Sequence, residues 1–355
     1  MTATIRQRWA RGGLAVAVAS WAATTANAQV PSEHPRHITP KTIKAIEAGR
    51  TFLARSQSSQ GSWRNATGYA GDVAVTMTAL SGLALLGAGS TPTEGPYAPN
   101  ISRAVSYVLK HADPRTGLIA SIHNTSRPMY CHGFSMLFLA QVYGMEEDPE
   151  RQGRIKVVLD RGVALTSRSQ SKLGGWLYTP DSNGDEGSVT VTQVQALRAC
   201  RNAGIEVPKK TIDEAMQYLD KSAQADGGIA YRVGMSGSRP PITAAAVACW
   251  YNAGMYDYPL AKKALSFCRK HIGVGGNARR TFGHYFYSHL YYAQVMYLSG
   301  DKHWDDYFPG MRDRLLATQA SDGSWQGDGV GNVYGTAIAL VILQLPYQYL
   351  PIMQR

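Results

Sequence analysis

The sequence contains few cysteines, and their spacing excludes two common roles. There are four in 355 residues, far fewer than a disulfide-stabilised scaffold has. No C-x-x-C pair and no histidine-rich spacing accompanies them, so no zinc site is expected. Buried thiols are the default prediction, and the sequence leaves open whether any two form a disulfide. The four are Cys131, Cys200, Cys249 and Cys268.

Long apolar runs and a matching number of acids are also absent. After residue 28 no segment has about 18 unbroken apolar residues, so no membrane-spanning helix is expected. Asp and Glu number 25 against 36 Lys and Arg, which gives a formal charge of +11. The basic residues are scattered and no nucleic-acid-binding motif accompanies them, so nucleic acid is not an expected partner. Attraction to a polyanion or a glycan stays open.

The first 28 residues have the features of an export signal. Three arginines precede the apolar residues 14–21, and residues 26–28 read Ala-Asn-Ala, a small-x-small cleavage site. The apolar run is too short to cross a bilayer. We therefore predict a signal peptide over residues 1–28, a linker over 29–40 and one domain of six repeats over 41–355. Export to the periplasm or the medium follows from this prediction.

One pattern, Q-x3-G-x-W, occurs three times, at residues 57–63, 170–176 and 319–325. Degenerate copies lie at 113–119 and 224–229. Successive copies lie roughly 50 to 57 residues apart, and the interval before the last copy is long enough for two units. The missing marker falls in the glycine-rich stretch 273–283. A fixed period of this length indicates a repeat architecture, and six units fit the chain.

Each unit contains two helical patterns of opposite character. Before each turn, apolar residues recur at three- and four-residue steps with charged residues between them, as in a half-exposed helix. These ranges are 41–57, 101–112, 155–170, 211–224, 259–271 and 304–319. After each turn the pattern is apolar nearly all round, as in a buried helix. These ranges are 72–86, 132–143, 188–203, 242–253, 285–298 and 333–345.

Six exposed helices that alternate with six buried ones predict two concentric rings, an all-α (α/α)6 toroid of six helical hairpins. An open solenoid is the alternative, and it requires polar caps at both ends. The last unit instead ends in an apolar segment, residues 345–352, which suits packing against the first unit. Closure into a ring is therefore the prediction.

The Q-x3-G-x-W turns resemble the QW repeats of squalene and terpene cyclases, and the layout is similar to the β subunits of protein prenyltransferases. The resemblance covers nearly all of the chain after the leader and implies the same toroid. Two segments, 174–193 and 334–352, look like exported bacterial proteins with prenyltransferase/squalene oxidase repeats, which have no settled activity. A shared fold does not give a function. The resemblance implies structural roles for Gln57, Trp63, Gln170, Trp176, Gln319 and Trp325.

Cyclases of the squalene-hopene type protonate an alkene with one aspartate of a D-x-D-D cluster. The nearest acids here are Asp181, Asp185 and Glu186, directly before the third buried helix, and they lack that spacing. They are the candidate catalytic acids. The alternative is an ordinary solvated loop with a helix cap.

Protein prenyltransferases instead use zinc held by an Asp-x-Cys pair and a later histidine. Met129 stands where that aspartate would precede Cys131, so the ligand set is incomplete. No metal or other cofactor is predicted. The Gly-Cys-Gly-Glu-Gln run of thioester-containing relatives is also absent from the sequence.

Aligning the buried helices on their terminal glycines brings polar residues to one mouth of the ring. Such a group can bind a polar ligand or perform acid–base chemistry. Its tyrosines can equally line an isoprenoid pocket or pack in the core. The predicted cavity-lining residues are Asp72, His132, Arg239, His284, Tyr285, Tyr287, His289 and Tyr334.

Three hypotheses for function remain. The first is an exported toroid that binds a ligand, an isoprenoid or another small apolar molecule, without the standard catalytic motifs. The second is a cyclase-like isomerase, which needs a large apolar cavity with a carboxylate inside it. The third is a polysaccharide-active lyase or hydrolase, which needs a groove lined by Arg239, histidine and tyrosine. The intact structural motifs and the missing catalytic ones favour the first.

Overall fold

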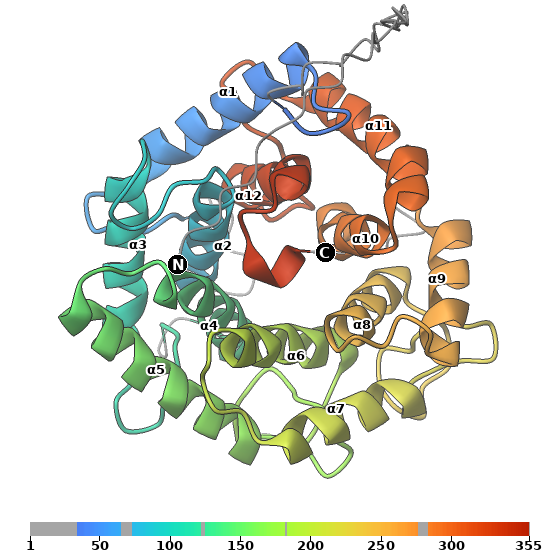
Figure 1. Cartoon of the computed structure of the whole chain (residues 1–355). Coiled ribbons are helices and arrows are strands. Elements are labelled where there is room, and N and C mark those ends of the chain that lie inside the picture. Colours follow the sequence, from blue (N-terminus) through green and yellow to red (C-terminus); the bar gives the residue numbers. More distant parts are fainter. Residues whose placement is uncertain (1–33, 65–72, 122–124, 182, 276–282, 355) are drawn as a thin grey trace, which may run out of the picture. The chain divides into compact units, whose positions relative to one another are not determined.

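The computed structural model describes residues 34–64, 73–121, 125–181, 183–275 and 283–354. These residues contain twelve α-helices and two short 3-10 helices, and no strand is found among them. Within residues 35–354 the helices form two concentric rings (Figure 1). The predicted fold class, an all-α (α/α)6 toroid, is confirmed.

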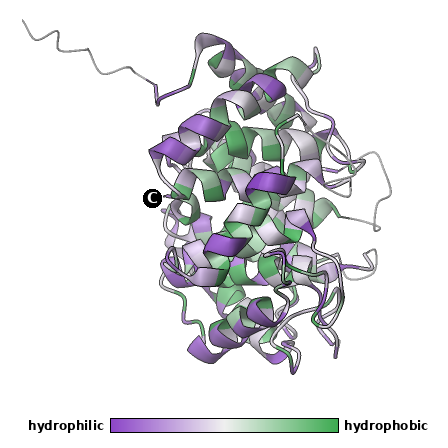
Figure 2. Cartoon of the chain, turned by 90° about the vertical axis from the view of Figure 1, so that its right-hand side faces the viewer, coloured by the Kyte–Doolittle hydropathy of each residue, from purple (hydrophilic) through white to green (hydrophobic). Residues whose placement is uncertain are grey.

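The outer ring consists of the helices that precede each turn. Their charged residues are mostly exposed and their apolar residues are mostly buried, so hydrophilic and hydrophobic residues alternate along each of these helices (Figure 2). These helices are α1 (Pro40–Ser56), α3 (Ala98–Lys110), α5 (Pro149–Arg168), α7 (Lys209–Lys221), α9 (Pro259–His271) and α11 (Asp301–Thr318).

The inner ring consists of the helices that follow each turn, and nearly every residue in them is buried. A helix surrounded by protein on all sides must be apolar on all faces, which is why these sequences show little amphipathic character. They are α2 (Ala74–Leu86), α4 (Pro128–Tyr143), α6 (Gly187–Asn202), α8 (Pro240–Asn252), α10 (Tyr285–Leu298) and α12 (Asn332–Gln344).

The ring is closed. Each inner helix contacts the inner helices of the two neighbouring units, and α12 contacts α2, which joins the last unit to the first. In the outer ring α1 contacts α11 in the same way. An open solenoid, the alternative considered from the sequence, is thereby excluded.

The tryptophans of the repeated turns are buried and hydrogen-bonded inside their own unit. The indole Nε1 of Trp63 donates to the carbonyl of Leu53 (2.7 Å), and Trp176 and Trp325 make the equivalent bond to Thr166 (2.7 Å) and Leu315 (2.8 Å). Each therefore fixes its turn to the last part of the preceding outer helix.

The glutamines of the turns connect neighbouring units. Gln57 Nε2 donates to the carbonyl of Gly61 (3.0 Å) in its own turn and to that of Asn100 (2.9 Å) in α3. Gln170 repeats this pattern toward α7. Gln319 donates to Ala45 of α1 (2.8 Å), so the last copy of the motif joins the two ends of the domain.

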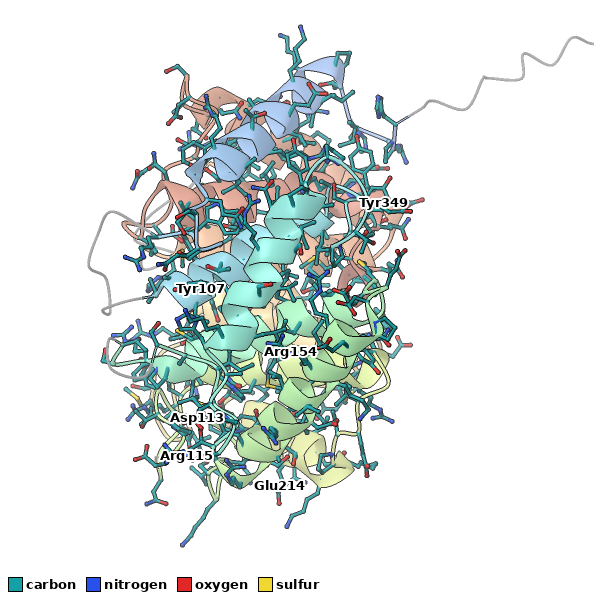
Figure 3. The ribbon with its side chains drawn as sticks, turned by 90° about the vertical axis from the view of Figure 1, so that its left-hand side faces the viewer. Tyr107, Asp113, Arg115, Arg154, Glu214 and Tyr349 are labelled. Carbon is teal, nitrogen blue, oxygen red and sulfur yellow. The ribbon has the colours of Figure 1, made fainter. Side chains whose placement is uncertain are left out.

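The end of the ring at the C-termini of the inner helices is covered by the C-terminal strap, residues 345–353, with its two short helices η1 (Leu345–Tyr347) and η2 (Pro351–Met353). The strap lies across the middle of the inner ring (Figure 1). The amide of Ile352 donates to Gln141 Oε1 (3.1 Å), and its carbonyl accepts from Gln294 Nε2 (3.2 Å). In Figure 3, Tyr349 of the strap and Asp113 of the second turn lie at opposite edges of the ring.

All four cysteines are buried, as the default prediction stated, and none of them forms a disulfide bond. Burial raises the pKa of the Cys200, Cys249 and Cys268 thiols, which keeps them protonated. In the part of the chain that the structure describes, no helix combines the length and the apolar character that crossing a bilayer requires.

Candidate functional site

Two adjoining cavities open at the N-terminal ends of the inner helices, the end opposite the strap. One has a volume of about 350 Å³ and a lining rich in arginine and tyrosine, and the other has about 130 Å³ and a more apolar lining. Four residues line both cavities and so mark the junction between them: Arg127, Tyr130, His284 and Tyr287. We call the larger one the mouth and the smaller one the apolar cavity.

The mouth combines two guanidinium groups with several phenol rings. Arg127 comes from the residue before α4 and Arg239 from the residue before α8. The Arg127 guanidinium lies 4.7 Å from the centre of the Tyr178 ring, a cation–π contact that orients it. The hydroxyls of Tyr178 and Tyr231 are hydrogen-bonded to each other.

The apolar cavity continues from the mouth between the inner helices. Its walls include Met77 and Leu80 of α2, Phe134 of α4, Leu290 of α10 and Ile338 of α12. Among its polar lining residues is Asp328, which lies in the loop before α12. Burial raises the pKa of this carboxyl, although backbone amides at the start of α10 act in the opposite direction.

A chain of hydroxyls runs from the cavities to a buried carboxylate. The Tyr130 hydroxyl lies 2.6 Å from Ser188 Oγ, which donates to Glu186 Oε2 at 2.6 Å. Since the Ser188 hydroxyl donates its hydrogen bond to the carboxylate, its oxygen is left to accept the hydrogen bond of the Tyr130 hydroxyl. The Tyr130 oxygen then offers lone pairs to a ligand at the junction.

The three candidate catalytic acids do not line either cavity. Asp181 is exposed in the loop before α6. Asp185 is buried behind the third turn, where it accepts from Ser171 Oγ (2.8 Å). Glu186 is the N-cap of α6 and accepts from the amides of Ser188 (2.8 Å) and Val189 (2.5 Å). Burial raises its pKa, which these bonds partly oppose.

His132 does not line the described cavities and instead holds the second turn. Its Nδ1 accepts the amide proton of Ile119 (3.3 Å). In other units a threonine of the inner helix accepts the equivalent amide proton, as Thr190 does from Trp176 (3.0 Å). The other ring nitrogen, Nε2, lies 3.0 Å from Thr166 Oγ1. Burial lowers the pKa of His132 to about 4, so it is neutral at pH 7.

His289 and Tyr285 also lie away from the described cavities. His289 is fully buried, its Nδ1 is 2.8 Å from the Tyr307 hydroxyl, and burial lowers its pKa to about 3. The Tyr285 hydroxyl donates to the carbonyl of Val274 (2.8 Å). Both side chains belong to the packing between α10 and the outer ring, because they lie on the side of α10 that faces α11.

Of the other predicted residues, Asp72 lies outside the described residues. The structure brings four together: Arg239 at the mouth, His284 and Tyr287 at the junction, and Tyr334 on the apolar cavity. The sequence prediction missed Arg127, Tyr130, Tyr178, Tyr231 and Asp328. Arg127 occupies the same place before α4 that Arg239 occupies before α8, so unit-by-unit alignment could have found it.

Among the described residues, no group of three or more His, Cys, Asp or Glu side chains comes close enough together to hold a metal ion. The polar side chains that line the two cavities include arginine, tyrosine, histidine and one carboxylate. These groups can bind an anion, accept and donate hydrogen bonds, and enclose a short apolar group.

Neither a protein-family model nor a curated protein matches the sequence. Solved structures match it well. The type II terpene cyclase MstE from Scytonema has a TM-score of 0.60 at 17% identity, over 88% of this chain and 98% of that one. An MstE variant in complex with geranylgeranyl dihydroxybenzoate (substrate) has a TM-score of 0.58 at 15% identity, with the same coverage.

A glycosidase has the same architecture. An inactive variant of the α-1,6-mannanase GH76A of Salegentibacter sp., in complex with α-1,6-mannotriose, has a TM-score of 0.59 at 10% identity, over 85% of this chain and 98% of that one. At such identities the likeness concerns the fold alone. The chain therefore has the α/α toroid fold that a terpene cyclase and a mannanase share.

Proposed function

We propose that the ring binds a small anionic amphiphile. Its acid group lies at the mouth with Arg127 and Arg239, and its apolar, isoprenoid-like tail enters the apolar cavity. The observation that carries this proposal is the direct junction of a cationic, tyrosine-rich mouth with a cavity walled by methionine, leucine and phenylalanine. Such a pocket matches a ligand that is charged at one end and apolar at the other.

The charge of the mouth favours an acid. Arginine presents a planar fork of donors that suits a carboxylate, and Arg127 is held over the Tyr178 ring. Glu186, which the Tyr130 and Ser188 hydroxyls connect to the mouth, already accepts two backbone amides and a serine hydroxyl. The two guanidinium groups in the lining of the mouth favour a negatively charged ligand.

The cavity volumes argue for binding rather than for cyclisation of a long polyprenyl chain. A cavity of about 150 Å³ accommodates benzene. The apolar cavity, at about 130 Å³, therefore has room for about one five-carbon isoprene unit. A cyclase must enclose the whole reacting chain and exclude water from it. The remainder of the ligand lies in the mouth, whose 350 Å³ is in the ordinary range for a small-molecule site.

A solved structure with the same fold supports the proposal, and the predicted leader adds a location to it. MstE, which has the same fold, has as its substrate a molecule with an acidic aromatic head and an isoprenoid tail. The predicted leader, residues 1–28, would place the binding activity in the periplasm or outside the cell. We keep export as part of the proposal.

A second candidate is an acidic oligosaccharide. The third hypothesis from the sequence required a groove lined by Arg239, histidine and tyrosine, and the mouth contains Arg239, His284 and four tyrosines. Tyrosine rings and arginine suit a sugar acid as well as a fatty acid. An oligosaccharide would leave the apolar cavity beside the mouth unfilled, and we therefore rank this candidate second.

Isothermal titration calorimetry with three probes tests the proposal. The probes are geranic acid, the matched neutral alcohol geraniol, and an oligogalacturonate. We expect geranic acid to bind at least about tenfold tighter than geraniol, because charge-assisted bonds to arginine are stronger than neutral ones. The Arg127→Gln/Arg239→Gln double variant should lose this preference.

The matched control is Arg154→Gln. Arg154 is exposed on the outer ring (Figure 3), so this variant removes one charge and leaves the mouth unchanged. It should bind geranic acid as the unmodified protein does. Equal affinity for geranic acid and geraniol would contradict the proposal, and tight binding of the oligogalacturonate alone would replace it with the second candidate.

A further inference from the structure

Asp328, which lines the apolar cavity, lies in a loop with several positive backbone φ angles. Its own φ is +45°, and those of Gly329 and Gly331 are +69° and +129°. A non-glycine residue rarely adopts a left-handed conformation, and where one does the surrounding structure holds it there. The structure around the loop before α12 therefore holds Asp328 in a left-handed conformation, and this conformation places its carboxylate on the cavity.

The contacts of Asp328 explain part of this placement. Its Oδ2 accepts the amide proton of Tyr287 (3.1 Å) in the first turn of α10. The N-cap residue of that helix, His284, makes no side-chain cap bond of its own. Asp328 thus caps α10 from a distant loop, and negative charge is favourable at a helix N-terminus.

The same carboxylate also lines the apolar cavity. A helix can be capped by a neutral Ser or Asn from its own first residue, at no cost in backbone strain. Here the capping group comes from another unit and borders a space whose walls include Met77, Leu80, Phe134 and Leu290 beside the junction residues. A ligand that fills this space removes water from the carboxylate.

We infer that the apolar end of the ligand carries a hydroxyl group that donates a hydrogen bond to Asp328. This inference rests on the proposed function and names the ligand more narrowly, as an acid with an apolar middle and a distal hydroxyl. A methyl group at the same place would desolvate the carboxylate and give no bond in return. Sites built to bond a hydroxyl discriminate strongly against analogues that lack it.

A hydroxyl suits the cavity better than an ammonium group. An ammonium buried against Asp328 would form an ion pair in an apolar space, and the desolvation of two charges opposes such a pair. It would also enter through a mouth that Arg127 and Arg239 make positive. A hydroxyl gives a charge-assisted bond without adding a second charge.

Calorimetry with geranic acid and 8-hydroxygeranic acid, which carries its hydroxyl on the terminal carbon, tests the inference. We expect the hydroxy acid to bind about tenfold tighter to the unmodified protein. Asp328→Asn keeps an oxygen for the Tyr287 amide but loses the charge, and should reduce this preference to about twofold or threefold. Asp306→Asn, an exposed residue of α11, is the matched control and should keep the full preference.

The outcomes separate the two proposals. If both acids bind equally to the unmodified protein, the distal hydroxyl is wrong and the proposed function stands. If Asp328→Asn keeps the full preference, the assignment to Asp328 is wrong. If neither acid binds, the proposed function fails and the inference fails with it. Melting temperatures of all variants show whether a lost preference reflects a changed contact or a loosened α10.

Discussion

Single side chains in the repeated turns hold the ring together, and the sequence motif identifies which ones. Glutamine can reach two carbonyls at once because its amide carries two N–H donors. In the last turn these carbonyls belong to Gly323 and to Ala45, at the other end of the domain. The motif predicted that Gln319 is structural, and its geometry shows that the bonds cross between units.

We predict that Gln319→Met destabilises the protein by about 2 kcal/mol, because two carbonyls lose a neutral hydrogen bond worth about 1 kcal/mol each. Denaturation in guanidinium chloride, followed by circular dichroism, measures this change. Gln326→Met is the control, since Gln326 lies in the same loop and is exposed. Equal stability of the two variants would contradict the assigned role of Gln319.

The turn glycines allow a second test at this scale. Gly174 has φ of +99°, and a Cβ atom there would lie 2.1 Å from the carbonyl oxygen of Glu214 in the next outer helix. Gly204 has a similar φ of +81° with open space around it. Gly204→Ala should cost about 1 kcal/mol and Gly174→Ala about 3 kcal/mol or more, measured by the same denaturation. If the two variants lost similar free energies of unfolding, the close contact between the third turn and α7 would not be required for stability.

His132 shows where residue-level prediction fails. The sequence places it near the mouth, and nothing in the sequence reveals that its ring replaces a threonine as acceptor for the turn. Its pKa is lowered to about 4 by burial, against an unfolded value near 6.5. The folded state therefore resists protonation more than the unfolded state, and stability present above pH 6.5 is lost as the pH falls toward 4.

We predict that His132→Thr, which keeps an acceptor for the Ile119 amide, weakens the decrease in stability between pH 7 and pH 4.5. The reduction should be on the order of 2 kcal/mol. The free energy of unfolding of both proteins is measured at several pH values and referred to pH 8, where histidines are neutral. Buried acids such as Glu186 act in the opposite direction in both proteins, so the difference isolates His132. Parallel pH curves would contradict the prediction.

At the scale of elements, the sequence predicted the helices well and their first residues less well. The ranges of α9 and α10 agree with the prediction, because proline or a loop glycine marks their beginnings. Helix α5 begins at Pro149 rather than at 155, since Asp148 caps it and Pro149 occupies the first helical position. The first turn of α5 is polar, so apolar periodicity could not detect it.

The C-terminal strap covers one end of the ring, and the two cavities open at the other end. It fills the centre at the C-terminal ends of the inner helices, and Ile352 within it is 3% exposed. We predict that Ile352→Ala lowers the free energy of unfolding by about 2 to 4 kcal/mol, as for other buried isoleucines. Gln354→Ala, just beyond the strap and exposed, should have little effect. A small effect of both would mean that the strap adds little to the core, and thermal denaturation distinguishes these outcomes.

At the scale of the molecule, the fold could be predicted and most of the site could not. Six repeats of two helical patterns, with an apolar end, were sufficient to predict a closed ring. The two cavities, in contrast, combine Arg127, Tyr178, Tyr231, Arg239 and Asp328 from different units and loops. Which of these side chains point inward depends on how the units rotate around the axis, and single-chain periodicity contains no information on that rotation.

The central claim, that the mouth holds a small anionic amphiphile, is tested most directly by native mass spectrometry of the protein purified from its own host. The unmodified protein and Arg154→Gln should each retain one small acid, which solvent extraction then identifies. The Arg127→Gln/Arg239→Gln variant, purified in the same way, should be free of it. An empty unmodified protein, or an acid retained equally by the double variant, would contradict the account.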